Sequence, residues 1–272
     1  MTAPFLSARM DLRKHYFCKL SPSGNTTVFL DAGEFPAERH AETAAALMGP
    51  LHLGAEQVGF ISREKKALRM MGGEFCVNAT RAFACLLARD HFKEHPGAAD
   101  YSDSLSVSGA EEAVRVSVLP NGYSEAMLAF TEMPAPAIIV PGISRVSLPG
   151  ISHMIVTGPL PADPLAEAEA LIKRHADASD GACGCIWLDA DGMSMHPYVW
   201  VRATDTLCAE TACGSGAVAC AALLHAVSGA GSASFLQPSG ERLDIALSVS
   251  PQKAQFTVGG FVRFIAEGFV YI

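Results

Sequence analysis

Hydrophobic and polar residues alternate in short runs along most of the chain, which is typical of β-strands with one buried face. Glycine, proline, asparagine and aspartate separate these runs and mark turns. In the first half the pattern predicts strands at residues 15–20, 27–31, 57–61 and 127–130, and a hairpin over 105–118. In the second half it predicts strands at residues 151–156, 185–188, 198–203, 243–249, 255–258, 261–265 and 268–272.

Four longer stretches are predicted to be helices. Residues 36–48 start with a proline, which suits a first helical turn, and stop before a Gly-Pro pair. Residues 163–175 start with Asp163, a good N-cap residue. The other two helices follow Cys76 and Cys213, and we expect them to end near residues 88 and 228.

A cysteine followed by a short turn and an apolar helix therefore occurs twice, at Cys76 and at Cys213. The two cysteines lie about half a chain length apart, and a repeat at that distance indicates two similar lobes. Each lobe would hold several short strands around one buried helix, so the expected fold class is α+β. The expected lobes are residues 1–130, completed by a C-terminal strand at about 262–272, and residues 131–261.

Composition indicates a globular protein, because half of the 272 residues are hydrophobic and 18% are charged. A formal charge of −8 and the lack of a basic tract argue against a nucleic-acid partner. The sequence shows no signal peptide and no apolar span of membrane length. We therefore expect a cytoplasmic protein without a membrane partner.

The eight cysteines suggest disulfides, a metal site or catalysis. Without a signal peptide, a disulfide framework is not expected in a chain of this size. Cys183, Cys185 and Cys208 are candidate metal ligands, but their spacing is not that of zinc sites and no paired histidine motif accompanies them. No metal site is predicted, and Cys18, Cys85 and Cys220 lie in apolar surroundings that favour small core residues.

Cys76 and Cys213 each stand just ahead of a helix N-terminus. The first amides of a helix have no partner within it, and the helix dipole is positive there, so such a position favours an anion. The same field is expected to lower the pKa of a thiol toward a reactive thiolate. The sequence thus predicts two reactive thiols, each beside a place for an anion.

Four motifs follow one another in order along the chain. They are Ser23-Gly-Asn25, Gly54-Ala-Glu-Gln57, Cys76-Val-Asn-Ala-Thr-Arg81 and Ala212-Cys-Gly-Ser-Gly216. Together they resemble the motifs of the cofactor-independent two-cysteine amino-acid racemases and epimerases, of which diaminopimelate epimerase is the best-known member. The resemblance spans nearly the whole chain. It implies a diaminopimelate epimerase-like fold of two pseudo-symmetric lobes, each with its sheet wrapped around a central helix.

The resemblance also implies an isomerase that needs no pyridoxal phosphate or other cofactor. A Cα–H is a very weak acid, so its inversion needs a base on one face and a proton donor on the other. In this family two facing thiols take these roles, and here they correspond to Cys76 and Cys213. The substrate carboxylate would lie between the two helix starts, held by backbone amides. The expected substrate contacts are Asn25, Val77, Asn78, Gly214 and Ser215.

Departures from the diaminopimelate epimerase pattern concern the distal end of the substrate. Thr204 and Asp205 stand where that enzyme has a Glu-Arg pair, so an arginine that would bind a distal carboxylate has become an acid. His153 stands in an altered Asn-Pro-His stretch, and it is either site-facing or a core histidine. An acidic pocket favours a neutral or cationic side chain. The motifs are most similar to those of histidine racemases of opine-metallophore pathways, so histidine is the leading substrate, with these three residues as further contacts.

Other functions stay open. Diaminopimelate epimerase and a racemase of another neutral or basic amino acid are the enzymatic alternatives, whereas proline racemases have a different lead-in to the second cysteine. Isomerases that use a carboxylate base are disfavoured because both cysteines are present. A non-enzymatic amino-acid-binding protein is the remaining alternative, since Val77 replaces the usual glycine and a β-branched residue restricts the backbone. Members of this family are often dimers, so the resemblance also allows a homodimer.

Overall fold

The computed structural model describes residues 13–202, 205–250 and 253–272. Its helices are η1 (Ala37–Arg39), α1 (His40–Met48), α2 (Val77–Glu94), α3 (Pro164–His175) and α4 (Gly214–Ser228). The strands of the first half are β1 (Lys14–Pro22), β2 (Thr27–Asp31), β3 (Gln57–Ser62), β4 (Ala67–Met70), β5 (Tyr101–Val107), β6 (Val114–Val118) and β7 (Tyr123–Phe130). The later strands are β8 (Ala137–Val140), β9 (Ile143–Leu148), β10 (Ile151–Thr157), β11 (Ala182–Asp189), β12 (Ser194–Val201), β13 (Thr206–Ala209), β14 (Ser232–Leu236), β15 (Arg242–Ser250) and β16 (Lys253–Tyr271).

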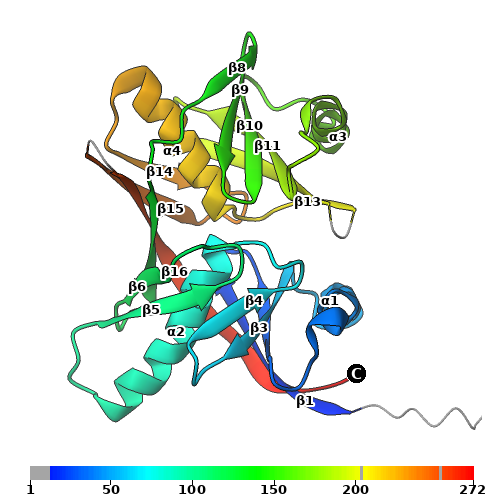
Figure 1. The fold of residues 1–272 in the computed structure, drawn as a ribbon, viewed down its shortest axis with the longest axis vertical. Helices are drawn as coiled ribbons and strands as arrows, with labels where there is room; N and C mark the ends of the chain where they lie inside the picture. Colours follow the sequence, from blue (N-terminus) through cyan, green and yellow to red (C-terminus); the bar gives the residue numbers. More distant parts are fainter. Residues whose placement is uncertain (1–12, 203–204, 251–252) are drawn as a thin grey trace, which may run out of the picture.

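The two halves of the chain pass through the same order of elements and strand pairings. In the first half β2 and β3 are parallel with α1 between them, β3 and β4 are antiparallel, and β4 and β5 are parallel with α2 between them. In the second half the same three relations join β10 to β11 across α3, β11 to β12, and β12 to β14 across α4. Figure 1 shows the halves stacked, with α1 and α3 on the same side. The repeat predicted from the two cysteine motifs is thus present in the topology.

β16 is one long strand that both halves share. Its residues 254–261 pair with β7, and residues 262–271 pair with β1. The sequence pattern predicts three short strands here, because glycines interrupt the apolar runs. These glycines instead mark close packing, since a Cβ at Gly259 would lie 2.3 Å from the Tyr123 hydroxyl and one at Gly260 would lie 2.5 Å from Oγ of Ser23.

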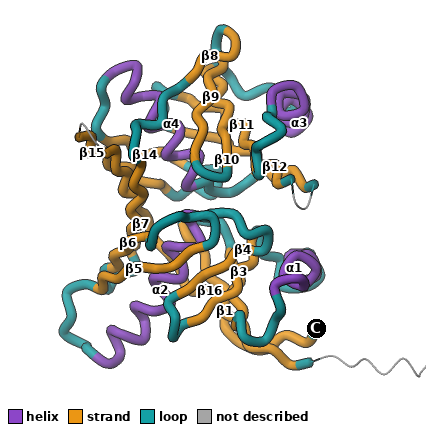
Figure 2. The backbone as a smooth tube through the Cα atoms, in the orientation of Figure 1, coloured by secondary structure: helices purple, strands orange, loops and turns teal. Residues whose placement is uncertain are grey.

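α2 and α4 are the buried helices around which the strands of the two halves curve (Figure 2). Every residue from 77 to 84 in α2 and from 216 to 223 in α4 is buried. A helix that is covered on all sides belongs to the core, and the many alanines let the surrounding strands approach closely. Both helices are most deeply buried at their starts, and these starts meet in the middle of the molecule (Figure 1).

Several element boundaries differ from the sequence prediction. α2 continues to Glu94 rather than ending near residue 88, because polar residues at its end lie at the surface and polarity alone does not end a helix. The proline-rich crossing contains the edge hairpin β8–β9, whose prolines stand before β8 and in its turn, where no ladder hydrogen bond is lost. Strands β4, β13 and β14 are not among the strands predicted from the sequence, although β14 is as long as the predicted β2. No helix in the described part of the chain is long and apolar enough to span a membrane.

Candidate active site

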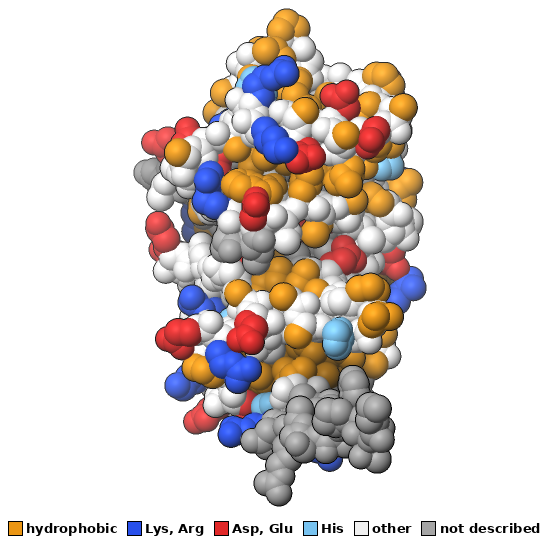
Figure 3. All heavy atoms as spheres, turned by 90° about the vertical axis from the view of Figure 1, so that its right-hand side faces the viewer, with side chains coloured by type: hydrophobic (Ala, Val, Ile, Leu, Met, Phe, Trp, Pro, Cys, Tyr) orange, Lys and Arg blue, Asp and Glu red, His pale blue; other side chains and the backbone are white. Residues whose placement is uncertain are grey.

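A cleft between the two halves lies where the starts of α2 and α4 meet. It encloses about 800 Å³, its open mouth included, and both Cys76 and Cys213 line it. Met48 at the end of α1 and Cys208 of β13 also line it, so the cleft belongs to the side on which α1 and β13 lie. Figure 3 views this side and shows hydrophobic side chains gathered across the middle of the face. The structure therefore brings the two predicted thiols into one site.

Cys76 is the N-cap residue of α2 and uses its sulfur as the cap. Its backbone is extended, and its Sγ accepts a hydrogen bond from the amide of Ala79 at 3.4 Å. The thiol donates a hydrogen bond to Oε1 of Gln57, the first residue of β3, at 3.0 Å. A side-chain cap is the usual way to satisfy a free amide of the first turn. The cap therefore fixes the direction of the sulfur relative to the helix.

Cys213 repeats this arrangement at the start of α4. Its Sγ accepts a hydrogen bond from the amide of Gly216 at 3.4 Å and lies 3.6 Å from Oγ of Ser215. Its own amide donates to Oε1 of Gln237 at 3.1 Å. A Cβ at Gly216 would lie 3.2 Å from this sulfur and 2.7 Å from Cδ1 of Ile186. Glycine at this position therefore leaves room for the capping sulfur.

The two helix starts pack directly on each other. A Cβ at Gly214 would lie only 2.8 Å from Cβ of Val77. Nδ2 of Asn78 donates to the carbonyl of Ala212 at 3.0 Å, which ties the first helix to the residue before Cys213. The amides of the first turns have no acceptor within their own helices. Val77, Asn78, Gly214 and Ser215 all line the cleft, and their binding of a substrate carboxylate stays a prediction.

The helix starts were expected to lower the pKa of the two thiols, but burial raises it. It raises the pKa of Cys76 to about 12, and the hydrogen bond from the Ala79 amide offsets only part of this rise. It also raises the pKa of Cys213 well above its ordinary value, and the charge of Glu210 acts in the same direction. The prediction of a lowered thiol pKa is wrong for this structure, and both thiols are protonated at neutral pH.

Glu210 is an acid of the cleft to which sequence analysis assigned no role. It lines the cleft together with Cys213 and Gln57. Burial raises its pKa to about 7, and the nearby charges of Glu56 and Glu74 act in the same direction. Its place three residues before Cys213 was the available signal, but the direction of its side chain depends on how β13 leads into α4.

Glu56 joins the two halves beside the cleft. One carboxylate oxygen accepts from the amide of Thr26 at 3.2 Å and from Oγ1 of Thr211 at 2.7 Å. The other accepts from the Thr211 amide at 3.1 Å and from Nδ2 of Asn25 at 3.1 Å. Asn25 itself is fully buried and does not line the cleft, so its side chain holds Glu56 and not a ligand directly. Glu56 and Gln57 are thus site residues that the sequence analysis quoted without a role.

His153 lies behind the cleft wall. Its ring is fully buried, and its Nε2 lies 2.9 Å from Oγ of Ser215, which lines the cleft. Burial lowers the pKa of His153 to about 3, so the imidazole is neutral. A Cβ at Gly184 would lie 2.1 Å from its Nδ1, and glycine there makes room for the ring. His153 therefore acts on the site through Ser215.

The structure does not bring Asp205 together with the thiols. Asp205 is exposed, does not line the cleft, and accepts a hydrogen bond from Nε1 of Trp200 at 3.0 Å. Thr204 lies outside the described residues. The acidic character expected of the pocket comes instead from Glu56, Glu74 and Glu210.

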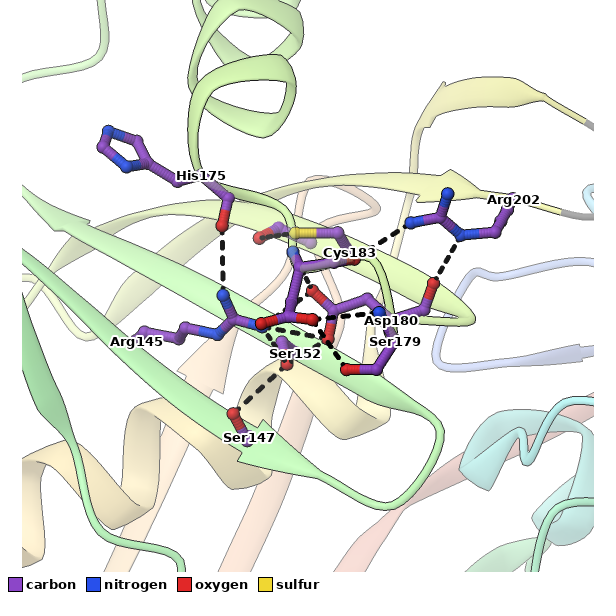
Figure 4. A network of polar contacts seen from close by, with 10 residues as sticks. Arg145, Ser147, Ser152, His175, Ser179, Asp180, Cys183 and Arg202 are labelled. Atoms are coloured by element: carbon purple, nitrogen blue, oxygen red, sulfur yellow. Dashed lines mark hydrogen bonds and ion pairs between the residues drawn. The ribbon is translucent and has the colours of Figure 1, made fainter.

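A polar cluster braces one wall of the cleft (Figure 4). Arg145 of β9 pairs with Asp180 at 2.7 Å and donates to the carbonyl of His175 at 3.0 Å. Ser152 donates to the same aspartate at 2.8 Å. The cluster ties the end of α3 to the start of β10, where Ile151 lines the cleft. Its groups satisfy one another, so its role is to hold the wall in place.

Known proteins share both the sequence and the fold of this chain. Residues 14–271 match the family described as "Histidine racemase CntK N-terminal domain". A histidine racemase of Fusobacterium nucleatum is 33% identical over 265 residues, which cover 94% of this chain and 97% of that protein. A predicted epimerase from Pseudomonas aeruginosa has a TM-score of 0.63 at 17% identity and covers 95% of this chain and 99% of its own. A PhzF-family phenazine biosynthesis protein from Enterococcus faecalis has a TM-score of 0.60 at 13% identity over 96% of this chain and 100% of its own.

The two kinds of similarity support different conclusions. The solved structures are too distant in sequence to carry more than the fold, which is the kind shared by epimerases and PhzF proteins. The family match is stronger, because it covers both cysteine motifs and nearly all of the described residues. By its sequence, the chain belongs to the histidine racemase family.

Proposed function

We propose that this protein is a cofactor-independent isomerase that interconverts L-histidine and D-histidine with Cys76 and Cys213 as its acid–base pair. The observation that carries the proposal is that the two thiols cap the starts of two buried helices and line one cleft. Membership of the histidine racemase family supports histidine as the substrate.

In this mechanism each thiol serves one face of the α-carbon. One sulfur, as a thiolate, removes the α-proton, and the opposite thiol donates its proton to the other face. The sulfurs exchange roles in the reverse direction, so both enantiomers are substrates. Because the two sulfurs have matching positions on repeated helix starts, the pair suits a reaction whose substrate and product are mirror images at the reacting carbon.

The substrate carboxylate would bind at the joined helix starts. The first-turn amides of α2 and α4 lie on the cleft wall, and both helix dipoles present their positive ends there. Negative charge that develops on the α-carbon and its carboxylate during proton removal is stabilised by the same groups. This is how an acidic cleft can still accept an amino acid.

The charged side chains of the cleft support a substrate with a neutral or cationic side chain. Among the described residues that line it, these are Glu56, Glu74 and Glu210, without a lysine or arginine. A second substrate carboxylate, as in diaminopimelate, would be repelled by these acids. An imidazole offers N–H donors to them. The sequence analysis based the preference for a neutral or cationic side chain on Asp205. In the structure this preference rests on the three glutamates of the cleft.

We further propose that the two-lobed fold is that of the diaminopimelate epimerase-like enzymes. The repeated order of pairings around α2 and α4, and the long shared strand β16, support this assignment. Lobe boundaries near residues 130 and 261, a cytoplasmic location, a homodimer and a place in opine-metallophore assembly stay predictions.

The test is to incubate the protein with L-histidine in D₂O without pyridoxal phosphate. Loss of the α-proton signal by NMR and the appearance of D-histidine on a chiral column are the expected results. Cys76→Ser and Cys213→Ser should each abolish racemisation, whereas Cys85→Ala, which removes a thiol outside the cleft lining, should retain it. Full activity in either serine variant would exclude the two-thiol mechanism. Exchange of the α-proton of meso-diaminopimelate but not of histidine would exclude histidine as the substrate.

A further inference from the structure

The segment that leads from β13 into α4 belongs to no helix or strand. Residues 210–213 therefore have no ladder of backbone hydrogen bonds to hold them in place. The carbonyl of Ala212 accepts from Nδ2 of Asn78 at 3.0 Å, and the carbonyl of Thr211 accepts from the amide of Ser239 at 3.0 Å. Groups far away in sequence thus decide where this segment delivers the second thiol.

Both of these contacts lead back to one side chain, Arg81 of α2. Nη1 of Arg81 donates to Oδ1 of Asn78 at 3.3 Å, and the Asn78 amide donates onward to Ala212. Nη2 of Arg81 donates to Oγ of Ser23 at 3.2 Å, and the carbonyl of Ser23 accepts from Oγ of Ser239 at 2.7 Å. These are the Asn78 path and the Ser23 path. They run from one guanidinium into the second half and converge on neighbouring residues.

Arg81 is an expensive residue to have at this place. Its side chain is fully buried, and its three acceptors are uncharged: the carbonyl of Ser124, the Asn78 amide oxygen and the Ser23 hydroxyl. Burial lowers the pKa of Arg81 to about 10, so the guanidinium is still charged at neutral pH. Neutral acceptors return only part of the cost of taking a cation out of water, and an apolar side chain avoids that cost. What only arginine supplies is a rigid, planar fork of donors with fixed directions.

The Ser23 path also contains a strained residue. Ser23 has a φ of 51°, in the left-handed region that serine rarely adopts. A Cβ at the next residue, Gly24, would lie 2.1 Å from Cβ of Ser239, so the two turns are in close contact. The amide of Ser23 donates to the carbonyl of Phe261 in the shared strand β16 at 2.8 Å. Such a conformation persists only where its surroundings over-determine it, and here Arg81 is one of them.

The other side chains that hold the segment do not belong to α2. Glu56 precedes β3 and accepts from the amide and the hydroxyl of Thr211. Gln237 follows β14 and accepts from the amide of Cys213. Arg81 stands in the second turn of the helix that the first thiol caps. Its two paths therefore tie the segment to the helix of the first thiol itself.

Resting on the proposed two-thiol function, we infer that Arg81 is a positioning residue that holds Cys213 opposite Cys76 across the substrate. It acts through the Asn78 path and the Ser23 path, and it does not itself line the cleft. Inversion requires that the donor sulfur meet the carbanion on the face opposite to the base. A donor that is displaced lets the carbanion regain a proton on the face from which the first one left. Loss of the paths should therefore slow inversion more than it slows proton removal.

The first test cuts the Ser23 path at its exposed end. Ser239→Ala removes the hydroxyl, and because Ser239 is exposed the free energy of unfolding should change little. We expect kcat for histidine to fall by about 10-fold with KM little changed. Ser228→Ala is the matched control, since it removes a serine-to-carbonyl hydrogen bond of 2.8 Å at the far end of α4 and should behave as wild type.

The diagnostic measurement is the fate of the α-proton in D₂O, started from each enantiomer. In Ser239→Ala, deuterium should accumulate in the remaining substrate, relative to the product formed, more than it does in wild type. A merely structural role would lower both together. Wild-type kcat in Ser239→Ala, or a reduced kcat with the wild-type ratio of exchange to inversion, would overturn the inference.

The second test uses Arg81→Lys, which keeps the positive charge but has no fork and so cuts both paths. Racemisation should fall by about 100-fold or more, with the same change in the ratio of exchange to inversion. Adding Ser239→Ala should cause little further loss, because both substitutions act on one path. Strictly additive losses, or near wild-type activity of Arg81→Lys, would refute the positioning role; if Arg81→Lys does not fold, Ser239→Ala decides alone.

The same assays separate this inference from the proposed function. If Cys76→Ser and Cys213→Ser still racemise histidine, the two-thiol function itself fails. If both serine variants are inactive while Ser239→Ala and Arg81→Lys behave as wild type, only the positioning role of Arg81 fails.

Discussion

Gly214→Ala tests whether direct contact between the two helix starts sets the geometry of the site. The added Cβ would lie 2.8 Å from Cβ and 3.2 Å from Cγ1 of Val77, and 3.2 Å from Oδ1 of Asn78. Carbon atoms pack best at about 3.5–4.0 Å, so one helix start has to move by up to roughly 1 Å. Neither neighbour can yield easily, because both are buried and Asn78 is held by hydrogen bonds to Ala212 and from Arg81.

The expected cost follows from this geometry. Overpacking of a well-packed site costs about 1–3 kcal/mol, and the better helix propensity of alanine returns at most about 1 kcal/mol. We therefore expect the free energy of unfolding to fall by about 1–2 kcal/mol. Since Cys213 is the N-cap of the displaced helix, a shift near 1 Å should lower kcat for histidine by about 100-fold.

Urea denaturation and racemase kinetics measure the two effects. Gly231→Ala is the matched control, because a Cβ there meets nothing within 4 Å and both changes should be small. Val77→Gly removes the opposing Cβ, so the double variant with Gly214→Ala should recover part of the lost stability. Two findings would refute the reasoning: Gly214→Ala behaving like the control, or strictly additive effects of the two substitutions.

Three further predictions concern the residues around this contact. Thr211→Val removes the 2.7 Å hydrogen bond to Glu56 and should cost about 1–2 kcal/mol in urea denaturation, with most of the cost absent in a Glu56→Ala background, which lacks the acceptor. Glu210 has a folded-state pKa raised from 4.5 to about 7, so the folded chain binds its proton more tightly and stability should fall as pH rises between these values. Glu210→Gln should lack this loss, and equal pH dependence of the urea midpoints of wild type and variant would contradict it. Arg81→Lys should cost about 2–4 kcal/mol, because a single ammonium cannot replace three guanidinium hydrogen bonds to Ser23, Asn78 and Ser124; a change below about 0.5 kcal/mol would show that the buried guanidinium is dispensable.

The sequence by itself determined the parts of the site that depend on neighbours along the chain. A cysteine before a glycine- or asparagine-containing turn and an apolar helix is a local pattern, so Cys76 and Cys213 were placed correctly as N-caps. The first-turn residues Val77, Asn78, Gly214 and Ser215 follow from the same pattern, and all of them line the cleft. The half-length repeat was equally visible, because each half must build the same elements in the same order.

Only the tertiary structure decided how the surroundings of the thiols behave. Local reasoning from the helix dipole predicts a low thiol pKa, but the packing of the two halves removes water from around both sulfurs and raises it, with Cys213 buried and Cys76 half-buried. Loops follow the packing of distant elements, so Asp205 contacts Trp200 outside the cleft while Glu210 lines the cleft with Cys213. His153 acts through Ser215 for the same reason, since β10 passes behind the start of α4. Hydrogen bonding along the chain places the two sulfurs, whereas burial and charge contributed by residues far away in sequence set their proton states.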